Sequence, residues 1–193
     1  MTRRPILVVI AGPNGAGKST LYDLVIGPDA DMPFVNADII QRDNLKNPDP
    51  KASYIAAKLA EAQRQALIAA RSSFVMESVF SHPSKLDLIR QAKAAGYSVA
   101  VYHIGVTSAD FSVTRVAKRV RQGGHPVPED KIRGRYNRNG AIIRQAVFLA
   151  DQGLIYDNSV NGQPPRTILK FKAGEEVERN PPLPNWVSDI YDN

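Results

Sequence analysis

A glycine-rich loop directly after an apolar run constrains this chain more than any other feature. Residues 5–10 form a continuous, β-branched run, which is typical of a strand buried on both faces of a sheet. Residues 12–19, GPNGAGKS, fit the pattern G-x-x-x-x-G-K-[ST], and a short helical pattern over residues 18–25 follows. In that order, a strand, a glycine loop and a helix N-terminus turn backbone amides toward a phosphate group. The sequence therefore predicts a phosphate-binding loop.

The loop also predicts which cofactors the chain uses. Lys18 is expected to reach the β- and γ-phosphates of ATP, and the Ser19 hydroxyl is expected to bind Mg²⁺. The amino-acid sequence of the loop resembles that of ABC-transporter ATPases. The chain, however, has neither an LSGGQ-like signature nor a long apolar strand ending in Asp-Glu. The candidate nucleotide-binding residues are Gly12, Pro13, Asn14, Gly15, Ala16, Gly17, Lys18, Ser19 and Thr20.

Strand and helix patterns alternate along the rest of the chain. Further strands are expected at 33–36, 73–76, 97–106, 153–156 and 167–171, and helices at 52–70, 84–95, 108–122 and 128 to about 150 with a break near Gly140. This alternation predicts an α/β P-loop NTPase fold, a doubly wound, mainly parallel sheet with helices on both faces. Residues 1–172 are expected to form the P-loop domain, and residues 173–193 an extended C-terminal tail.

Two acidic residues follow predicted strands. Asp38 comes just after the strand at 33–36, and Glu77 comes just after the strand at 73–76. Ligands of doubly wound folds bind beyond the carboxyl ends of the strands, so both carboxylates are expected near the γ-phosphate. One of them is then suited to accept the proton of an attacking hydroxyl, while the other holds the substrate or organises the water around the metal. The alternative for either residue is an ordinary helix cap or turn.

The net positive charge of the protein lies in one segment. The formal net charge is +6, and residues 115–138 carry eight basic and two acidic residues, while the rest of the chain is balanced. Like charges four residues apart on a helix repel each other unless an anion binds between them. Glycines and prolines at 123–128 join the two predicted helices, so we expect a helical, arginine-bearing lid over about 115–138 that closes on a phosphoryl group. A solvated basic face is the alternative, and nucleic acid is disfavoured because no aromatic stacking pattern accompanies the charge.

Composition excludes several other classes of protein. The chain has 193 residues and no cysteine, which rules out disulfide scaffolds, thiolate zinc sites and cysteine nucleophiles. The apolar run near the N-terminus is too short for a signal peptide, and no stretch reaches the length needed to span a bilayer. A cytoplasmic protein with no membrane partner is therefore expected.

Together, these motifs resemble the zeta-toxin family of small P-loop kinases. The resemblance covers residues 6–157 and rests on AGPNGAGKST at 11–20, FVNAD at 34–38, FVMES at 74–78 and the block from 115 to 128 that contains GGH-x-VP, followed by Ile132 and Arg135-Tyr136. Kinases of this family phosphorylate a sugar hydroxyl of UDP-N-acetylglucosamine, and many are silenced by an antitoxin. The resemblance therefore implies a nucleotide-sugar acceptor and an antitoxin partner.

The resemblance also implies roles for individual residues. Asp38 is expected to act as the base that deprotonates the sugar hydroxyl, and Glu77 to anchor the acceptor. Two lid arginines are expected at the transition state, and Arg119 and Arg135 fit best by position, with Arg121 and Arg133 as alternatives. The candidate acceptor-binding residues are Asn36, Asp38, Glu77, Ser78 and His125.

Three other interpretations stay open at this point. The chain is also compatible with a housekeeping small-metabolite kinase that resembles gluconate or shikimate kinases. A nucleic-acid-stimulated ATPase would use the basic segment and show steep salt dependence. A regulatory module would bind nucleotide and form no product.

Overall fold

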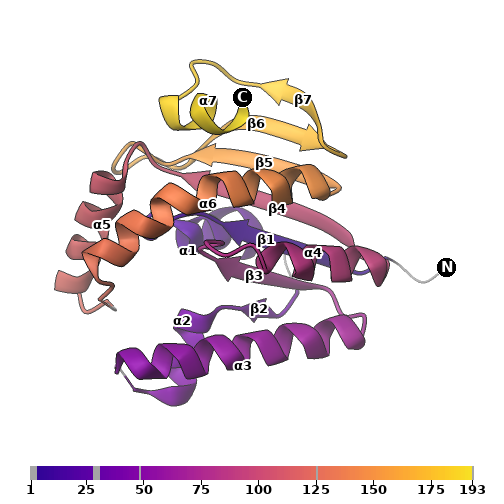
Figure 1. Ribbon diagram of the computed structural model, residues 1–193, viewed down its shortest axis with the longest axis horizontal. Coiled ribbons are helices and arrows are strands. Elements are labelled where there is room, and N and C mark those ends of the chain that lie inside the picture. The colour runs from indigo at the N-terminus through magenta and orange to yellow at the C-terminus, as the bar shows by residue number, and fades with distance from the viewer. Residues whose placement is uncertain (1–3, 28–30, 48, 125, 193) are drawn as a thin grey trace.

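One seven-stranded sheet organises the molecule (Figure 1). The computed structural model describes residues 4–27, 31–47, 49–124 and 126–192. The strand order is β2-β3-β1-β4-β5-β6-β7, in which β1 to β5 are parallel and β6 and β7 continue the sheet antiparallel. The strands are β1 Ile6–Ala11, β2 Phe34–Val35, β3 Phe74–Ser78, β4 Ser98–Gly105, β5 Gln152–Asp157, β6 Arg166–Lys172 and β7 Glu175–Arg179.

Helices cover both faces of the sheet. The side chains of α3, α4, α6 and α7 form one core cluster with the sheet, and those of α1 and the π-helical turn η1 form a second cluster. Among the described residues, no helix is both long and apolar enough to cross a membrane. The helical elements are α1 Lys18–Leu21, η1 Tyr22–Ile26, α2 Ala37–Ile39, η3 Ile40–Leu45, α3 Pro50–Ala69, α4 Lys85–Ala94, α5 Ala109–Arg121, α6 Glu129–Leu149 and α7 Asn185–Tyr191.

Strand β1 explains why the first apolar run has no polar alternation. Its side chains alternate between the two cores, with Leu7 and Val9 in the larger cluster and Val8 and Ile10 in the smaller one. A central strand of a two-faced sheet must be apolar on both sides because neither face meets water. The strand ends at the glycine loop, which is thereby held at the carboxyl edge of the sheet between β3 and β4.

The fold class predicted from the sequence is confirmed. The sheet is mainly parallel with helices on both faces, and each predicted strand has an observed counterpart. The second strand is shorter than expected, with only Phe34 and Val35 paired to β3. The helix expected over residues 18–25 is also modified, because α1 continues as the π-helical turn η1 after its first four residues.

Two expectations about helices and termini are wrong. Helix α6 runs from Glu129 to Leu149 without the break expected near Gly140. A Cβ at Gly140 would lie 2.6 Å from Ile190 Cδ1, so the glycine allows α7 to approach α6 rather than ending the helix. Residues 173–193 are not an extended tail, because β7 pairs with β6, and α7 buries Trp186 in the larger core cluster.

Candidate active site

The glycine loop wraps around its own lysine. Gly15 and Gly17 have positive φ values of 74° and 93°, a left-handed backbone that glycine adopts without steric cost. The Lys18 Nζ donates to the Pro13 carbonyl oxygen at 3.0 Å, and its side chain is only 7% exposed. Because the loop closes this way, the ammonium group is held at the mouth of the loop, where phosphate oxygens bind in P-loop proteins.

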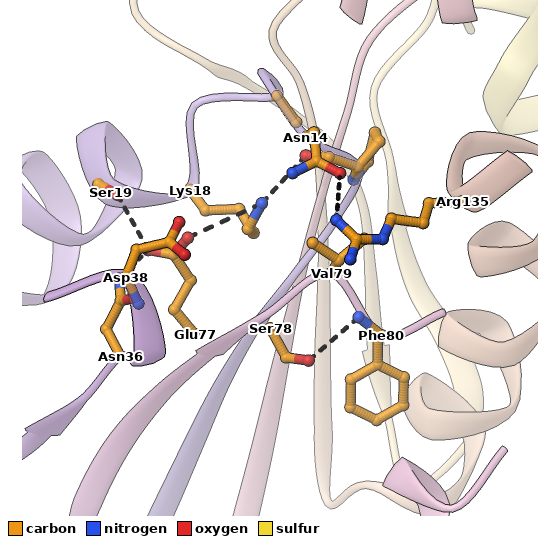
Figure 2. A network of polar contacts seen from close by, with 12 residues as sticks. Asn14, Lys18, Ser19, Asn36, Asp38, Glu77, Ser78, Val79, Phe80 and Arg135 are labelled. Atoms are coloured by element: carbon orange, nitrogen blue, oxygen red, sulfur yellow. Dashed lines mark hydrogen bonds and ion pairs between the residues drawn. The ribbon is translucent and has the colours of Figure 1, made fainter. Parts of the chain in front are cut away.

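Glu77 lies at the centre of a polar cluster beside the loop (Figure 2). Its Oε2 accepts hydrogen bonds from the Ser19 hydroxyl and from Asn36 Nδ2, each at 2.9 Å. Its Oε1 lies 3.8 Å from Lys18 Nζ. Strand β3 pairs directly with β1, so the carboxyl end that carries Glu77 is adjacent to the start of the loop. The structure therefore brings this acid to the serine expected to bind the metal.

Asp38 approaches the same cluster from β2. Asn36 caps the short helix α2 by accepting the Asp38 backbone N–H at 2.8 Å, which places Asp38 in the first helical turn. The Asp38 carboxylate is exposed, and Figure 2 shows it on the same side as Ser19 and Lys18. An exposed carboxylate at this edge of the sheet is accessible to an acceptor molecule.

The charges around Lys18 come from four elements. Burial lowers the pKa of Lys18 from its ordinary value, Glu77 and Asp38 oppose this shift, and Arg119 and Arg135 add to it. All four side chains therefore act electrostatically at one ammonium group. Two carboxylates and three cations gathered at one strand edge suit a ligand that brings several negative charges.

One helix of the predicted lid brings an arginine into contact with the loop. Arg135, on α6, donates from Nη1 to Asn14 Oδ1 at 3.3 Å, and Figure 2 shows its guanidinium group directed toward the loop. Arg133 instead pairs with Asp110 at 2.7 Å and Glu129 at 2.8 Å. The choice of Arg135 over Arg133 at this position is consistent with these contacts, and the charge of Arg119 is also felt at Lys18.

Other sequence candidates stand apart from this cluster. The Ser78 hydroxyl accepts the Phe80 backbone N–H at 3.1 Å and thereby forms the turn after β3 (Figure 2). Thr20 is exposed on α1. His125 lies outside the described residues. Arg115, on α5, donates to Asn161 Oδ1 and covers the Phe111 ring.

Sequence reasoning missed two buried asparagines that hold the site together. Asn158 donates from Nδ2 to the Ala16 carbonyl oxygen at 2.8 Å, and Asn139 donates to the Val79 carbonyl oxygen at 3.3 Å. Asn158 immediately follows β5, so the rule that singled out Asp38 and Glu77 would have found it had amides been considered along with acids. Asn139 gave no comparable signal because it lies within a long helix.

The oxygen atoms at the loop suit a divalent cation that needs few protein ligands. Among the described residues, no group of three or more histidine, cysteine or acidic side chains is placed to hold a metal. The Ser19 hydroxyl and the Glu77 carboxylate are hard oxygen donors 2.9 Å apart. Mg²⁺ usually keeps several waters and takes the rest of its ligands from one or two side chains and substrate phosphates, so this pair fits it.

The fold and the site together define a P-loop phosphotransferase of the kinase class. A parallel sheet, a G-x-x-x-x-G-K-S loop with its lysine, strand-end acids and lid arginines are the parts that phosphoryl transfer requires. The family model described as Zeta toxin matches residues 1–161, and the chain therefore belongs to the zeta-toxin family.

The chain is also similar to one curated protein in sequence and to several solved structures in fold. An uncharacterized protein of Haemophilus influenzae is 32% identical over 130 residues, which cover 67% of this chain and 91% of that protein. A chain of the AvrRxo1-ORF1:-ORF2 complex superposes with a TM-score of 0.69 at 17% identity, and the match covers 90% of this chain and 60% of that chain. A chain of the PezAT chromosomal toxin-antitoxin system of Streptococcus pneumoniae gives 0.67 at 14% identity, over 99% of this chain and 80% of that one.

Proposed function

We propose that this protein transfers the γ-phosphoryl group of ATP to a hydroxyl of a nucleotide sugar of the UDP-N-acetylglucosamine type. The observation that carries the proposal is the convergence of Lys18, Glu77, Asp38 and the lid arginines at one end of the sheet. Membership of the zeta-toxin family supports the reaction type, and an AvrRxo1-ORF1:-ORF2 structure with ATP, at a TM-score of 0.66, supports the nucleotide.

The proposed transfer needs one base and several cations. The acceptor hydroxyl attacks the γ-phosphorus, its proton passes to the Asp38 carboxylate, and the bond from the γ-phosphorus to the β–γ bridging oxygen breaks, leaving ADP. Lys18, Arg119 and Arg135 neutralise the charge that develops on the transferring and leaving oxygens. Exposure of Asp38 supports its role, because the base must meet the acceptor.

For Glu77 we propose a role beside the metal rather than the acceptor. Its hydrogen bond to the Ser19 hydroxyl and its proximity to Lys18 favour an acid that orients the ligands of Mg²⁺. When bound, Mg²⁺ would neutralise charge on the phosphate oxygens. Asn36 then aligns Glu77 through its own hydrogen bond at 2.9 Å, and Asp38 is left free to face the acceptor.

The experiment that tests the proposal is a product analysis by mass. The protein is incubated with ATP and Mg²⁺ in parallel reactions, each with one addition: a UDP-sugar, a simple sugar, a gluconate- or shikimate-like acid, or RNA. A gain of one phosphoryl group on a UDP-sugar alone supports the proposal. A gain on a simple sugar or acid instead makes the protein a small-metabolite kinase, and ATP hydrolysis that rises only with added RNA makes it a nucleic-acid-stimulated ATPase.

A protein partner is proposed on the same grounds. The PezAT proteins form a toxin-antitoxin system, so we propose that an antitoxin holds this kinase silent. Expression of the wild-type chain alone should then arrest bacterial growth, while Asp38→Asn, with intact folding, should not. Equal growth arrest by both chains would show that toxicity, if present, does not arise from phosphoryl transfer.

A further inference from the structure

The end of β5 holds the phosphate loop from behind. Asn158 is buried, 8% exposed, and its Nδ2 donates to the Ala16 carbonyl oxygen at 2.8 Å. Its backbone N–H donates to the Gly105 carbonyl oxygen at 2.9 Å, so the residue is fixed to the end of β4 as well. A Cβ at Gly17 would overlap the same Nδ2 atom. The loop and the asparagine are therefore in direct van der Waals contact.

This contact determines which way one amide of the loop points. In a planar trans peptide, the carbonyl oxygen and the following N–H point in opposite directions. Because the Ala16 carbonyl oxygen faces Asn158, the Gly17 N–H faces away from it. Gly17 is flexible at its positive φ of 93°, so the peptide between Ala16 and Gly17 would be easy to flip without an external anchor.

The anchor is itself held by the C-terminal helix. Asp157, the residue before Asn158, accepts a hydrogen bond from the Trp186 indole Nε1 at 2.8 Å. Trp186, on α7, is 7% exposed, and its ring lies where a Cβ at Gly105 would be, with ring carbons 2.5 to 2.7 Å from that position. A chain of contacts thus runs from α7 through the ends of β4 and β5 to the phosphate loop.

We propose that Asn158 is a positioning residue for the bound nucleotide: it aims the Gly17 amide at the phosphates, and the contact between Trp186 and Asp157 keeps Asn158 in place. The inference rests on nucleotide binding by the loop, which is part of the proposed function. It gives the C-terminal segment, beyond the residues 1–161 that the family model matches, a part in nucleotide affinity. Buried hydrogen bonds to a backbone carbonyl are costly to lose, since the carbonyl is then left without a partner.

The test compares two substitutions of the same kind in the segment that follows β5. Asn158→Asp puts a carboxylate oxygen against the Ala16 carbonyl oxygen, whereas Asn161→Asp adds the same charge at an exposed residue that contacts Arg115. The dissociation constant for ATP with Mg²⁺ is measured by calorimetry, along with the melting temperature. We expect Asn158→Asp to weaken binding about tenfold or more, and Asn161→Asp to change it less than about threefold, as is usual for an exposed charge.

Two further variants keep the inference falsifiable if Asn158→Asp does not fold. Asn158→Ala removes the donor without adding charge and should also weaken binding. Trp186→Phe keeps an aromatic ring against Gly105 but removes the indole donor, and should weaken nucleotide binding by a smaller factor. A purely structural role would lower the melting temperature and leave the affinity of the folded protein unchanged.

The binding measurements distinguish a failure of the inference from a failure of the proposed function. If the wild-type protein binds ATP and a folded Asn158 variant binds it equally tightly, the inference is wrong and the proposed function stands. The same conclusion follows if Asn161→Asp weakens binding as much as Asn158→Asp. If the wild-type protein binds no nucleotide, both the inference and the proposed function fail.

Discussion

At the scale of single residues, the charges of two carboxylates and two guanidinium groups act on Lys18. Its burial lowers its pKa, which disfavours the charged form, while Glu77 and Asp38 favour that form. Arg119 and Arg135 also disfavour the charged form, so positive charges repel one another at the buried ammonium group. A triphosphate relieves this repulsion, so we expect the electrostatic environment to favour the bound state.

The first prediction distinguishes the role of the base from nucleotide binding. Asp38→Asn should keep ATP binding within about threefold but lower phosphoryl transfer by about 10²-fold or more, because the amide cannot accept the hydroxyl proton. Lys18→Ala should abolish turnover of the nucleotide altogether. Rapid-quench measurement of product formation and calorimetric measurement of ATP binding distinguish these outcomes. Transfer at the wild-type rate by Asp38→Asn would mean that another group is the base.

The second prediction distinguishes the lid arginines. Arg135→Ala and Arg119→Ala should each lower the transfer rate by about 10²-fold, because each removes a charge proposed to stabilise the transferring phosphoryl group. Arg133→Ala is the matched control on the same helix as Arg135. It loses exposed ion pairs with Asp110 and Glu129, which contribute little, so its rate should stay within about twofold. A loss with Arg133→Ala as large as with Arg135→Ala would contradict the assignment.

At the scale of elements, α7 docks on β4 through a buried polar contact. His103 Nδ1 and the Tyr191 hydroxyl lie 2.8 Å apart, and the His103 ring meets the Trp186 ring edge-on at 5.2 Å. Burial lowers the pKa of His103 to about 3. Helix α7, which lies in the segment expected to be an extended tail, is thus attached by a histidine that stays neutral in the folded protein.

The third prediction concerns the pH dependence of stability. The unfolded chain binds a proton at His103 below its ordinary pKa of 6.5, whereas the folded protein does so only near 3. This contribution to stability is therefore present above pH 6.5 and is lost as the pH falls toward 3. Between pH 7 and pH 5, the free energy of unfolding measured in urea should fall by about 2 kcal/mol less in His103→Gln than in the wild type.

The control for this prediction is the same substitution at His82, the other histidine that the structure describes. His82 is exposed and lies outside the core, so His82→Gln tests whether the loss of any histidine has the same effect between pH 7 and pH 5. If His103→Gln and the wild type lose the same stability over that interval, protonation of His103 does not contribute to acid destabilisation.

At the scale of the whole molecule, one sheet joins the nucleotide site to the C-terminus. The site lies at the carboxyl ends of β1 to β3, and β6, β7 and α7 extend the same sheet and core beyond β5 (Figure 1). A ligand that binds only the folded form stabilises the entire cooperative unit. Nucleotide binding should therefore be visible in global unfolding and at distant parts of the sheet.

The fourth prediction uses the only tryptophan of the chain as the distant reporter. Trp186 contacts Asp157 next to the anchor of the loop, so ATP with Mg²⁺ should change its fluorescence emission. The same ligand at a hundredfold excess over its dissociation constant should stabilise the protein by about 2.7 kcal/mol. Lys18→Ala should show neither effect. A melting temperature that does not respond to ATP in the wild type would contradict binding at the loop.

Much of the fold and the core of the site were predictable because their signals are local. The β-branched run, the glycine loop and the acids after the strands each lie within a few residues of the structure they specify. Local patterns were misleading where distant packing decided the outcome. Gly140 indicates a helix break by propensity, yet α6 continues through it, and the absence of a side chain there leaves room for Ile190 of α7.

By itself, the sequence determined the parallel sheet, the phosphate loop and the acids beside it. Only the tertiary structure decided that Glu77 meets Ser19, that Arg135 rather than Arg133 reaches the loop, and that Asn158 contacts the phosphate loop. The physical reason is separation along the chain. Asn158 and Ala16 are 142 residues apart, and such a contact exists only when the whole sheet has closed around it.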